Sequence, residues 1–125
     1  NKLLNKFTMK KKILCFDLDN VLCITKSNNY KISKPIRKNI NLVNKLFKKG
    51  FYIKIFTARY MGRNNENSKL VKKKYYKKTY KQLISWKLKF HELIMGKPTY
   101  DIYIDDKSYN VNDKKTVKII EKLIG

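Results

Sequence analysis

The sequence predicts an α/β fold with a mainly parallel central sheet. Three observations predict it. Short apolar runs of strand length alternate with longer segments whose apolar residues recur at helical spacing. Strands that alternate with helices favour parallel pairing, because each helix carries the chain back across the sheet. The 125 residues suit one domain, and no shift of composition divides them, so we expect a single domain over residues 1–125.

The first half of the chain supplies two strands and a helix. Residues 12–17 are apolar with β-branched and aromatic side chains, which is typical of a buried strand. Residues 20–30 are polar and irregular. A helix is expected to start near Ser33 and to stop at Gly50, and residues 51–56 predict the second strand.

The second half repeats the alternation. A loop over residues 60–67 precedes a long helix at about 68–87. Residues 90–94 and 100–104 predict a third and a fourth strand. Asp113 is expected to cap a last helix whose apolar residues face inward.

The net charge of +22 could indicate a partner that is a polyanion. The 31 basic residues, however, are 28 Lys and 3 Arg, whereas phosphate- and base-reading proteins favour the bidentate Arg fork. With abundant Asn, Ile and Tyr, the Lys excess resembles the composition of an A/T-rich genome. Nucleic acid is therefore a partner that the sequence allows but does not favour.

Compartment and cysteine usage point to a cytoplasmic protein. No apolar run has the length of a membrane span, and the first residues lack the apolar stretch of a signal peptide. Cys15 and Cys23 match no metal or redox spacing, so two reduced thiols are expected. A homo-oligomer is compatible with the sequence.

Polar side chains follow each of the four predicted strands. Asp17 and Asp19 follow the first, Thr57 ends the second, and Lys97 follows the third. Asp105 and Asp106 end the fourth. Because ligands of open α/β sheets bind beyond the carboxyl ends of the strands, these six residues are expected to form one site.

The chemistry of such a site suits phosphoryl transfer. Carboxylates gathered at one edge would repel one another without a cation, and their oxygens suit Mg²⁺. Lys97, the Thr57 hydroxyl and the metal could stabilise the oxygens of a phosphate ester. An ionised Asp could attack phosphorus, and a second Asp could protonate the leaving oxygen.

The ordered set resembles the haloacid dehalogenase superfamily over about residues 10–107. Its first motif, Asp-x-Asp-x-Thr/Val, is matched by Asp17, Asp19 and Val21. The Thr, the Lys and the paired acids that follow later strands are matched by residues 57, 97, 105 and 106. Asn20 stands where many relatives carry Gly, which Asn can replace because it tolerates left-handed backbone angles.

The resemblance implies a three-layer Rossmann-like fold and a phosphatase that uses Mg²⁺. It implies that Asp17 is the nucleophile and Asp19 the acid/base. It also implies that Asp17, the Asp19 carbonyl and Asp105 bind the metal, with Asp106 assisting through water. Because the gaps between motifs are short, no cap domain is expected, and an open site suits a bulky substrate.

The sequence does not identify the substrate. The segments 57–63 and 91–98 resemble short phosphatase-like proteins of bacterial capsule and surface-polysaccharide genes, which suggests a sugar- or glycan-related phosphate. Arg59 and Arg63 are candidates for binding it, with simple surface exposure as the alternative. Two further alternatives are a nucleic-acid end phosphatase and a polyanion-binding protein with a vestigial site.

Overall fold

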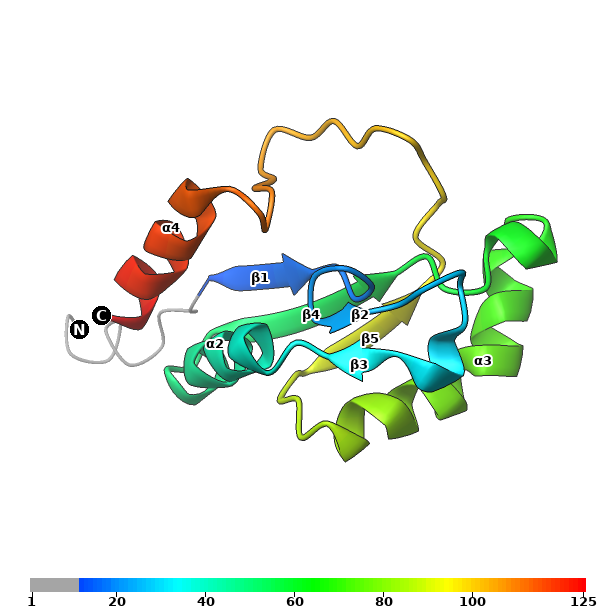
Figure 1. Cartoon of the computed structure of the whole chain (residues 1–125), viewed down its shortest axis with the longest axis horizontal. Helices are drawn as coiled ribbons and strands as arrows, with labels where there is room; N and C mark the ends of the chain where they lie inside the picture. The colour runs from blue at the N-terminus through cyan, green and yellow to red at the C-terminus, as the bar shows by residue number, and fades with distance from the viewer. Residues whose placement is uncertain (1–11) are drawn as a thin grey trace, which may run out of the picture.

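The computed structural model describes residues 12–125, and its centre is a parallel sheet. The strands are β1 (Ile13–Phe16), β4 (Tyr52–Thr57) and β5 (Glu92–Met95), in the order β1-β4-β5. Both pairings are parallel, so the three strands end at the same edge (Figure 1). The predicted α/β fold with a parallel sheet is confirmed, and the arrangement is consistent with a Rossmann-like fold.

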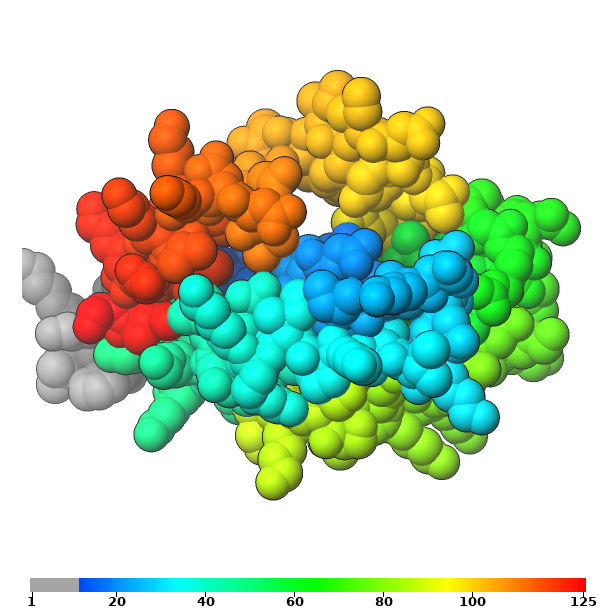
Figure 2. Space-filling model, in the orientation of Figure 1, coloured from blue at the N-terminus to red at the C-terminus, as the bar shows by residue number. Residues whose placement is uncertain are grey.

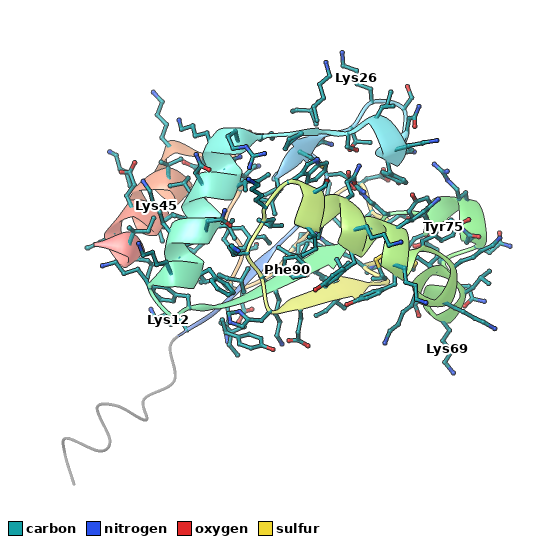
Figure 3. All side chains as sticks on the ribbon, turned by 90° about the horizontal axis from the view of Figure 1, so that it is seen from below. Lys12, Lys26, Lys45, Lys69, Tyr75 and Phe90 are labelled. Carbon is teal, nitrogen blue, oxygen red and sulfur yellow. The ribbon has the colours of Figure 1, made fainter. Side chains whose placement is uncertain are left out.

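Two helices cover one face of this sheet. Helix α2 (Arg37–Lys48) connects β1 to β4, and α3 (Ser68–Ser85) connects β4 to β5. Both connections step across the sheet in the same direction, so right-handed crossovers place both helices on the same face. Figure 3 shows this helical face. Ile53 and Ile55 of β4 are fully buried beneath it, whereas the alternating residues of β4 point to the other face.

The third helix does not complete the predicted third layer. Helix α4 (Lys114–Ile124) packs against α2, near the end of the sheet where β1 begins (Figure 1). Its predicted cap is confirmed, since the Asp113 carboxylate accepts from the Lys115 N–H at 2.9 Å. On the second face of the sheet, Lys54 and Glu92 form a half-exposed ion pair at 3.7 Å. Such polar pairing suits a face that no helix buries.

Residues 100–104 do not form the predicted fourth strand. The chain over residues 98–112 arches away from the sheet without pairing (Figure 1), and an opening remains beneath it (Figure 2). Ile102 and Ile104 are 79% and 91% exposed. The alternating pattern suits a strand, but a strand needs a partner for its backbone groups, and none pairs here. Within the described residues β1 is therefore an edge of the sheet.

The segments between the main elements are small. Between β1 and α2 lie an antiparallel pair, β2 (Cys23–Ile24) with β3 (Lys34–Pro35), and the short helix η1 (Tyr30–Ile32). Between β4 and α3 lies only η2 (Gly62–Asn64). In the described part of the chain, none of the helices combines the length and apolar character needed to cross a bilayer. The expectation about a signal peptide concerns residues 1–11, which lie outside the described residues.

Candidate active site

A pocket of about 460 Å³ opens beyond the carboxyl ends of β1, β4 and β5. Its lining includes Asp17, Asp19, Arg59 and Lys97. These residues follow three different strands, and the parallel pairing gathers them at one edge. The location agrees with the rule that open α/β sheets bind ligands beyond their carboxyl ends.

Asp17 and Lys97 form the centre of the pocket. The Lys97 ammonium lies 3.4 Å from Asp17 Oδ2. Asp17 Oδ1 accepts a hydrogen bond from the Leu18 N–H at 2.8 Å, which fixes the orientation of the carboxylate. The Asp17 side chain keeps about a third of its surface exposed, at 32%, so a ligand in the pocket can reach it.

The backbone around Lys97 is tightly held. The Lys97 N–H donates to the Thr57 carbonyl at 3.1 Å and so ties the end of β5 to the end of β4. The preceding Gly96 has φ +97°, and a Cβ there would lie 2.8 Å from the Ser68 Cβ. Glycine is required at this position both by its backbone angle and by the close approach of α3.

Lys97 is 7% exposed and faces two tyrosines. Its ammonium lies 5.1 Å and 4.8 Å from the ring centroids of Tyr100 and Tyr103. Burial acts to lower the pKa of Lys97, but a hydrogen bond with the Tyr100 side chain and the charge of Asp17 outweigh it, so that the pKa is raised. Lys97 therefore carries its positive charge at neutral pH.

Asp19 sits in a network of donors. Arg59 Nε lies 3.1 Å from Asp19 Oδ1 and 3.0 Å from Oδ2, and Arg59 Nη2 lies 3.0 Å from Oδ1. The Thr25 hydroxyl also donates to Oδ1. With its side chain 21% exposed, Asp19 still lines the pocket, but its position is set by these donors.

Arg59 is enclosed rather than exposed. It is 2% exposed, and its remaining N–H groups donate to Gln82 Oε1 and Ser33 Oγ. The contact with Gln82 reaches α3, and that with Ser33 reaches the segment before α2. Arg59 thus connects the acid/base candidate to the helical layer, and its guanidinium has little capacity left for a ligand.

The turn after β1 carries the first motif. Asn20 has φ 66°, so the left-handed angle that its side chain was expected to tolerate is present. Its N–H donates to the Cys23 carbonyl at 2.7 Å and closes the turn. Cys23 is fully buried, and burial together with the nearby Asp19 raises its pKa to about 11. The Cys23 thiol is therefore a packing group and not a nucleophile.

Arg63, Tyr30 and Tyr60 form one side of the rim of the pocket. Arg63 is exposed, lies 5.3 Å from the ring centroids of both Tyr30 and Tyr60, and donates to the Asn28 carbonyl at 2.8 Å. The Tyr60 ring stacks on Tyr75 of α3 at 3.8 Å. Of the two arginines expected to contact substrate, Arg63 is the one placed where a ligand can reach it.

Three of the predicted site residues do not line the pocket: Thr57, Asp105 and Asp106. Thr57 is fully buried at the end of β4, and its hydroxyl accepts from the Arg59 N–H at 3.1 Å, so it supports the turn behind the pocket. Asp105 and Asp106 lie on the exposed arch. Among residues 12–125 no group of three or more His, Cys, Asp or Glu side chains could hold a metal ion. The structure therefore does not bring the second acidic pair to the first.

The donor set at the pocket matches the expected magnesium site only in part. Mg²⁺ is usually held by one or two carboxylates, with water and substrate phosphate supplying the other oxygens. The Asp17 carboxylate and the Asp19 carbonyl are suitable protein donors here, whereas the Asp19 carboxylate is taken up by Arg59 and Thr25. One carboxylate beside a positively charged lysine would bind Mg²⁺ weakly unless a substrate phosphate supplied further oxygen ligands.

Several contacts of the site could not be predicted from the sequence. Thr25 and Ser33 share a hydrogen bond and hold Asp19 and Arg59, yet both lie in a segment that reads as irregular. Gln82 lies on a helix face where only apolar spacing was informative. Tyr30, the first residue of η1, also lines the pocket.

Comparisons with known proteins support the fold. Neither a protein-family model nor a curated protein sequence matches the chain. The crystal structure of an MCSG target from Vibrio cholerae is similar, with 24% identity and a TM-score of 0.75 over 90% of this chain and 96% of that one.

Two structures of the Pnkp1/Rnl/Hen1 complex, one described as an RNA repair complex, each contain a similar region. Their TM-scores are 0.51 and 0.52 at 16% identity, and the matches cover 92% and 90% of this chain but 30% and 34% of those chains. At identities this low, the comparisons show a similar fold only.

Proposed function

We propose that the protein is a magnesium-dependent phosphomonoesterase that works through an aspartyl-phosphate on Asp17. The observation that carries the proposal is the Asp17–Lys97 pair at 3.4 Å in an open pocket at the carboxyl ends of parallel strands. A carboxylate that can attack and a cation that can hold phosphoryl oxygens are the two parts that such chemistry requires.

The proposed reaction has two displacements on phosphorus. In the first, Asp17 Oδ2 attacks, the bond from phosphorus to the ester oxygen breaks, and Asp19, which enters this step in its protonated form, gives its proton to that oxygen. In the second, Asp19 takes a proton from water, the water oxygen attacks phosphorus, and the bond to Asp17 breaks. Asp17 is regenerated and inorganic phosphate leaves.

Lys97 and the enclosed Arg59 have different parts in this scheme. Lys97 lies beside the attacking oxygen, where it neutralises charge on the phosphoryl group. Arg59 does not contact the phosphoryl group and positions Asp19 through three N···O contacts. Bound Mg²⁺ would supply further positive charge to the phosphoryl oxygens.

The absence of a cap domain is part of the proposal. Within the described residues, the two places where a cap could enter hold only β2, η1 and β3, or η2 and α3. A pocket with this little cover admits a phosphate at the end of a large molecule.

The proposed function is tested by hydrolysis of an aryl phosphate with and without Mg²⁺. Turnover that requires Mg²⁺ supports the proposal, and turnover unaffected by EDTA contradicts it.

Replacement of Lys97 by Met should lower kcat by roughly 10²–10³, because a preorganised charge at the phosphoryl oxygens is lost. Lys54→Met is the matched control, since Lys54 lies on the other face of the sheet and pairs with Glu92. Steady-state kinetics on an aryl phosphate measures both. An unchanged rate in Lys97→Met would remove Lys97 from the mechanism.

Asp105 and Asp106 are part of the proposal as metal ligands, on the strength of the ordered motifs. The uncovered Ile102 and Ile104 beside them favour a second, less exposed position for this segment. Asp105→Asn should raise the Mg²⁺ concentration for half-maximal rate on the order of 10–100-fold, the range seen when support for a metal is lost. An unchanged Mg²⁺ requirement would mean that Asp105 stays outside the site.

A further inference from the structure

Helix α3 carries an unusual concentration of positive charge. Seven of its 18 residues are lysines and none is acidic. The lysines are Lys69, Lys72, Lys73, Lys74, Lys77, Lys78 and Lys81. Within the described part of the chain, no carboxylate lies within ion-pair distance of any of them. The helix therefore exposes a dense positive surface without internal compensation.

The spacing of these lysines destabilises α3 in the free protein. Lys69, Lys73, Lys77 and Lys81 follow one another at intervals of four, so each lies one helical turn from the next. Like charges at this spacing destabilise a helix. The lysines of α2, by contrast, are interspersed with Asn. A bound polyanion would remove the repulsion along α3, and a solvated surface would not.

Aromatic side chains are interleaved with the charges. Tyr76 lies in a groove between lysines 69, 72, 73 and 77, and its ring faces Tyr80 at 6.0 Å. Tyr80 is 40% exposed. A basic groove with accessible aromatic rings is the arrangement that holds single-stranded nucleic acid, in which phosphates meet lysines and bases stack on rings.

The rim of the pocket reaches α3 at Lys78, on the side of the helix away from Tyr76 and Tyr80. The exposed lysines 74, 77 and 73 lead from there across α3 to the groove. Lys78 lies 5.0 Å from the ring centroids of both Tyr60 and Tyr75. Tyr60 also lines the pocket, where Arg63 lies over it. Figure 3 shows Tyr75 on α3 with Lys69 near one end of the helix, pointing away from the body. A chain that leaves the pocket past Arg63 would meet Lys78 next.

We infer that α3 binds single-stranded nucleic acid and that the pocket receives the terminal phosphate of that strand. The inference rests on the proposed function and names its substrate class, a polynucleotide with a phosphorylated end. An anionic membrane would use the charge but not the rings. A membrane-bound helix would also need a broad apolar face, whereas the outer face of α3 is mostly lysine.

Binding is measured in EDTA, so that turnover plays no part. Fluorescence anisotropy with a labelled oligothymidylate at increasing KCl should give a log–log slope on the order of −2 to −3, because each phosphate neutralised on a single strand contributes about −0.7. Inorganic polyphosphate of the same charge and vesicles of phosphatidylcholine with phosphatidylserine compete separately. Weaker competition by both supports the inference, and equal competition by either overturns it.

Two double variants that change the net charge equally, one on α3 and one on α2, test where the oligonucleotide binds. Lys73→Glu with Lys77→Glu should weaken oligonucleotide binding at least tenfold, because it reverses two charges of the groove. Lys45→Glu with Lys48→Glu reverses two exposed charges on α2 and should weaken it less than threefold. Equal losses in the two variants would show that net charge alone attracts the strand and would overturn a site on α3.

A kinetic arm separates this inference from the proposed function. In Lys73→Glu with Lys77→Glu, KM for an end-phosphorylated oligonucleotide should rise about tenfold, while kcat and KM for an aryl phosphate stay unchanged. If the aryl phosphate is hydrolysed but the variant leaves KM for the oligonucleotide unaltered, the inference on α3 is overturned and the phosphatase stands. If oligonucleotide binds at α3 but no phosphate ester is hydrolysed, the proposed chemistry is overturned instead.

Discussion

Asp17→Asn should reduce kcat on an aryl phosphate by at least about 10⁴-fold, the scale on which removal of a nucleophile acts. Asparagine keeps the size of the side chain and its acceptor for the Leu18 N–H. It loses the carboxylate oxygen that lies beside Lys97 and would attack phosphorus. The protein should still bind inorganic phosphate, because Lys97 is left without its counter-charge.

The fold should survive this change. Asp17 is a third exposed but Lys97 is buried, so the loss of the pair should cost about 1–3 kcal/mol of the free energy of unfolding. Asp101→Asn is the control for removing one acid, since Asp101 is exposed on the arch. Activity within tenfold of the unmodified protein in Asp17→Asn would exclude Asp17 as the nucleophile.

Arg59→Met should destabilise the protein by about 3 kcal/mol and also remove most of the activity. The buried guanidinium bonds Asp19, Gln82 and Ser33, and Met removes these bonds, so that Asp19 and Ser33 are left with their bonds to Thr25. Removal of one partner of a buried ion pair costs about 3–5 kcal/mol, and Asp19 retains some contact with water, which favours the lower end. For a chain of this length, the melting temperature should fall on the order of 10 °C.

Two comparisons separate the positioning role of Arg59 from stability alone. Arg63→Met removes an exposed arginine with one hydrogen bond and two tyrosine ring contacts and should change stability by no more than about 1 kcal/mol. Arg59→Lys restores the charge without the planar fork, so it should recover part of the stability but little of kcat. Full recovery of kcat by Lys would show that charge alone suffices and that Asp19 does not need to be oriented.

The sequence was most informative where a local pattern alone determines the structure. Strand β4 and helix α3 lie where apolar runs and helical spacing predict them. The gathering of Asp17 and Lys97 also followed from the sequence, because parallel strands end at one edge whatever their detailed packing. Asn20 could be assigned its left-handed angle because few other residues tolerate one.

What could not be predicted depends on contacts between distant segments. The apolar alternation around Ile102 and Ile104 suits a strand, but pairing depends on a neighbour that local sequence does not specify, and the structure leaves both side chains exposed. Arg59 reads as a substrate ligand because arginine is rare in this chain. Its enclosure follows from Gln82, 23 positions later, and from Ser33, 26 positions earlier. No spacing rule relates such residues.

The covalent intermediate on Asp17 is the claim that a single measurement tests most directly. The protein is mixed with an excess of aryl phosphate and Mg²⁺, quenched in acid within milliseconds, and analysed by mass spectrometry, intact and after proteolysis. We expect a gain of one phosphoryl group, located on the peptide that contains Asp17, removed by hydroxylamine, and absent from Asp17→Asn. Turnover in the same sample without a phosphoryl group on Asp17, or with one on another residue, would contradict the account.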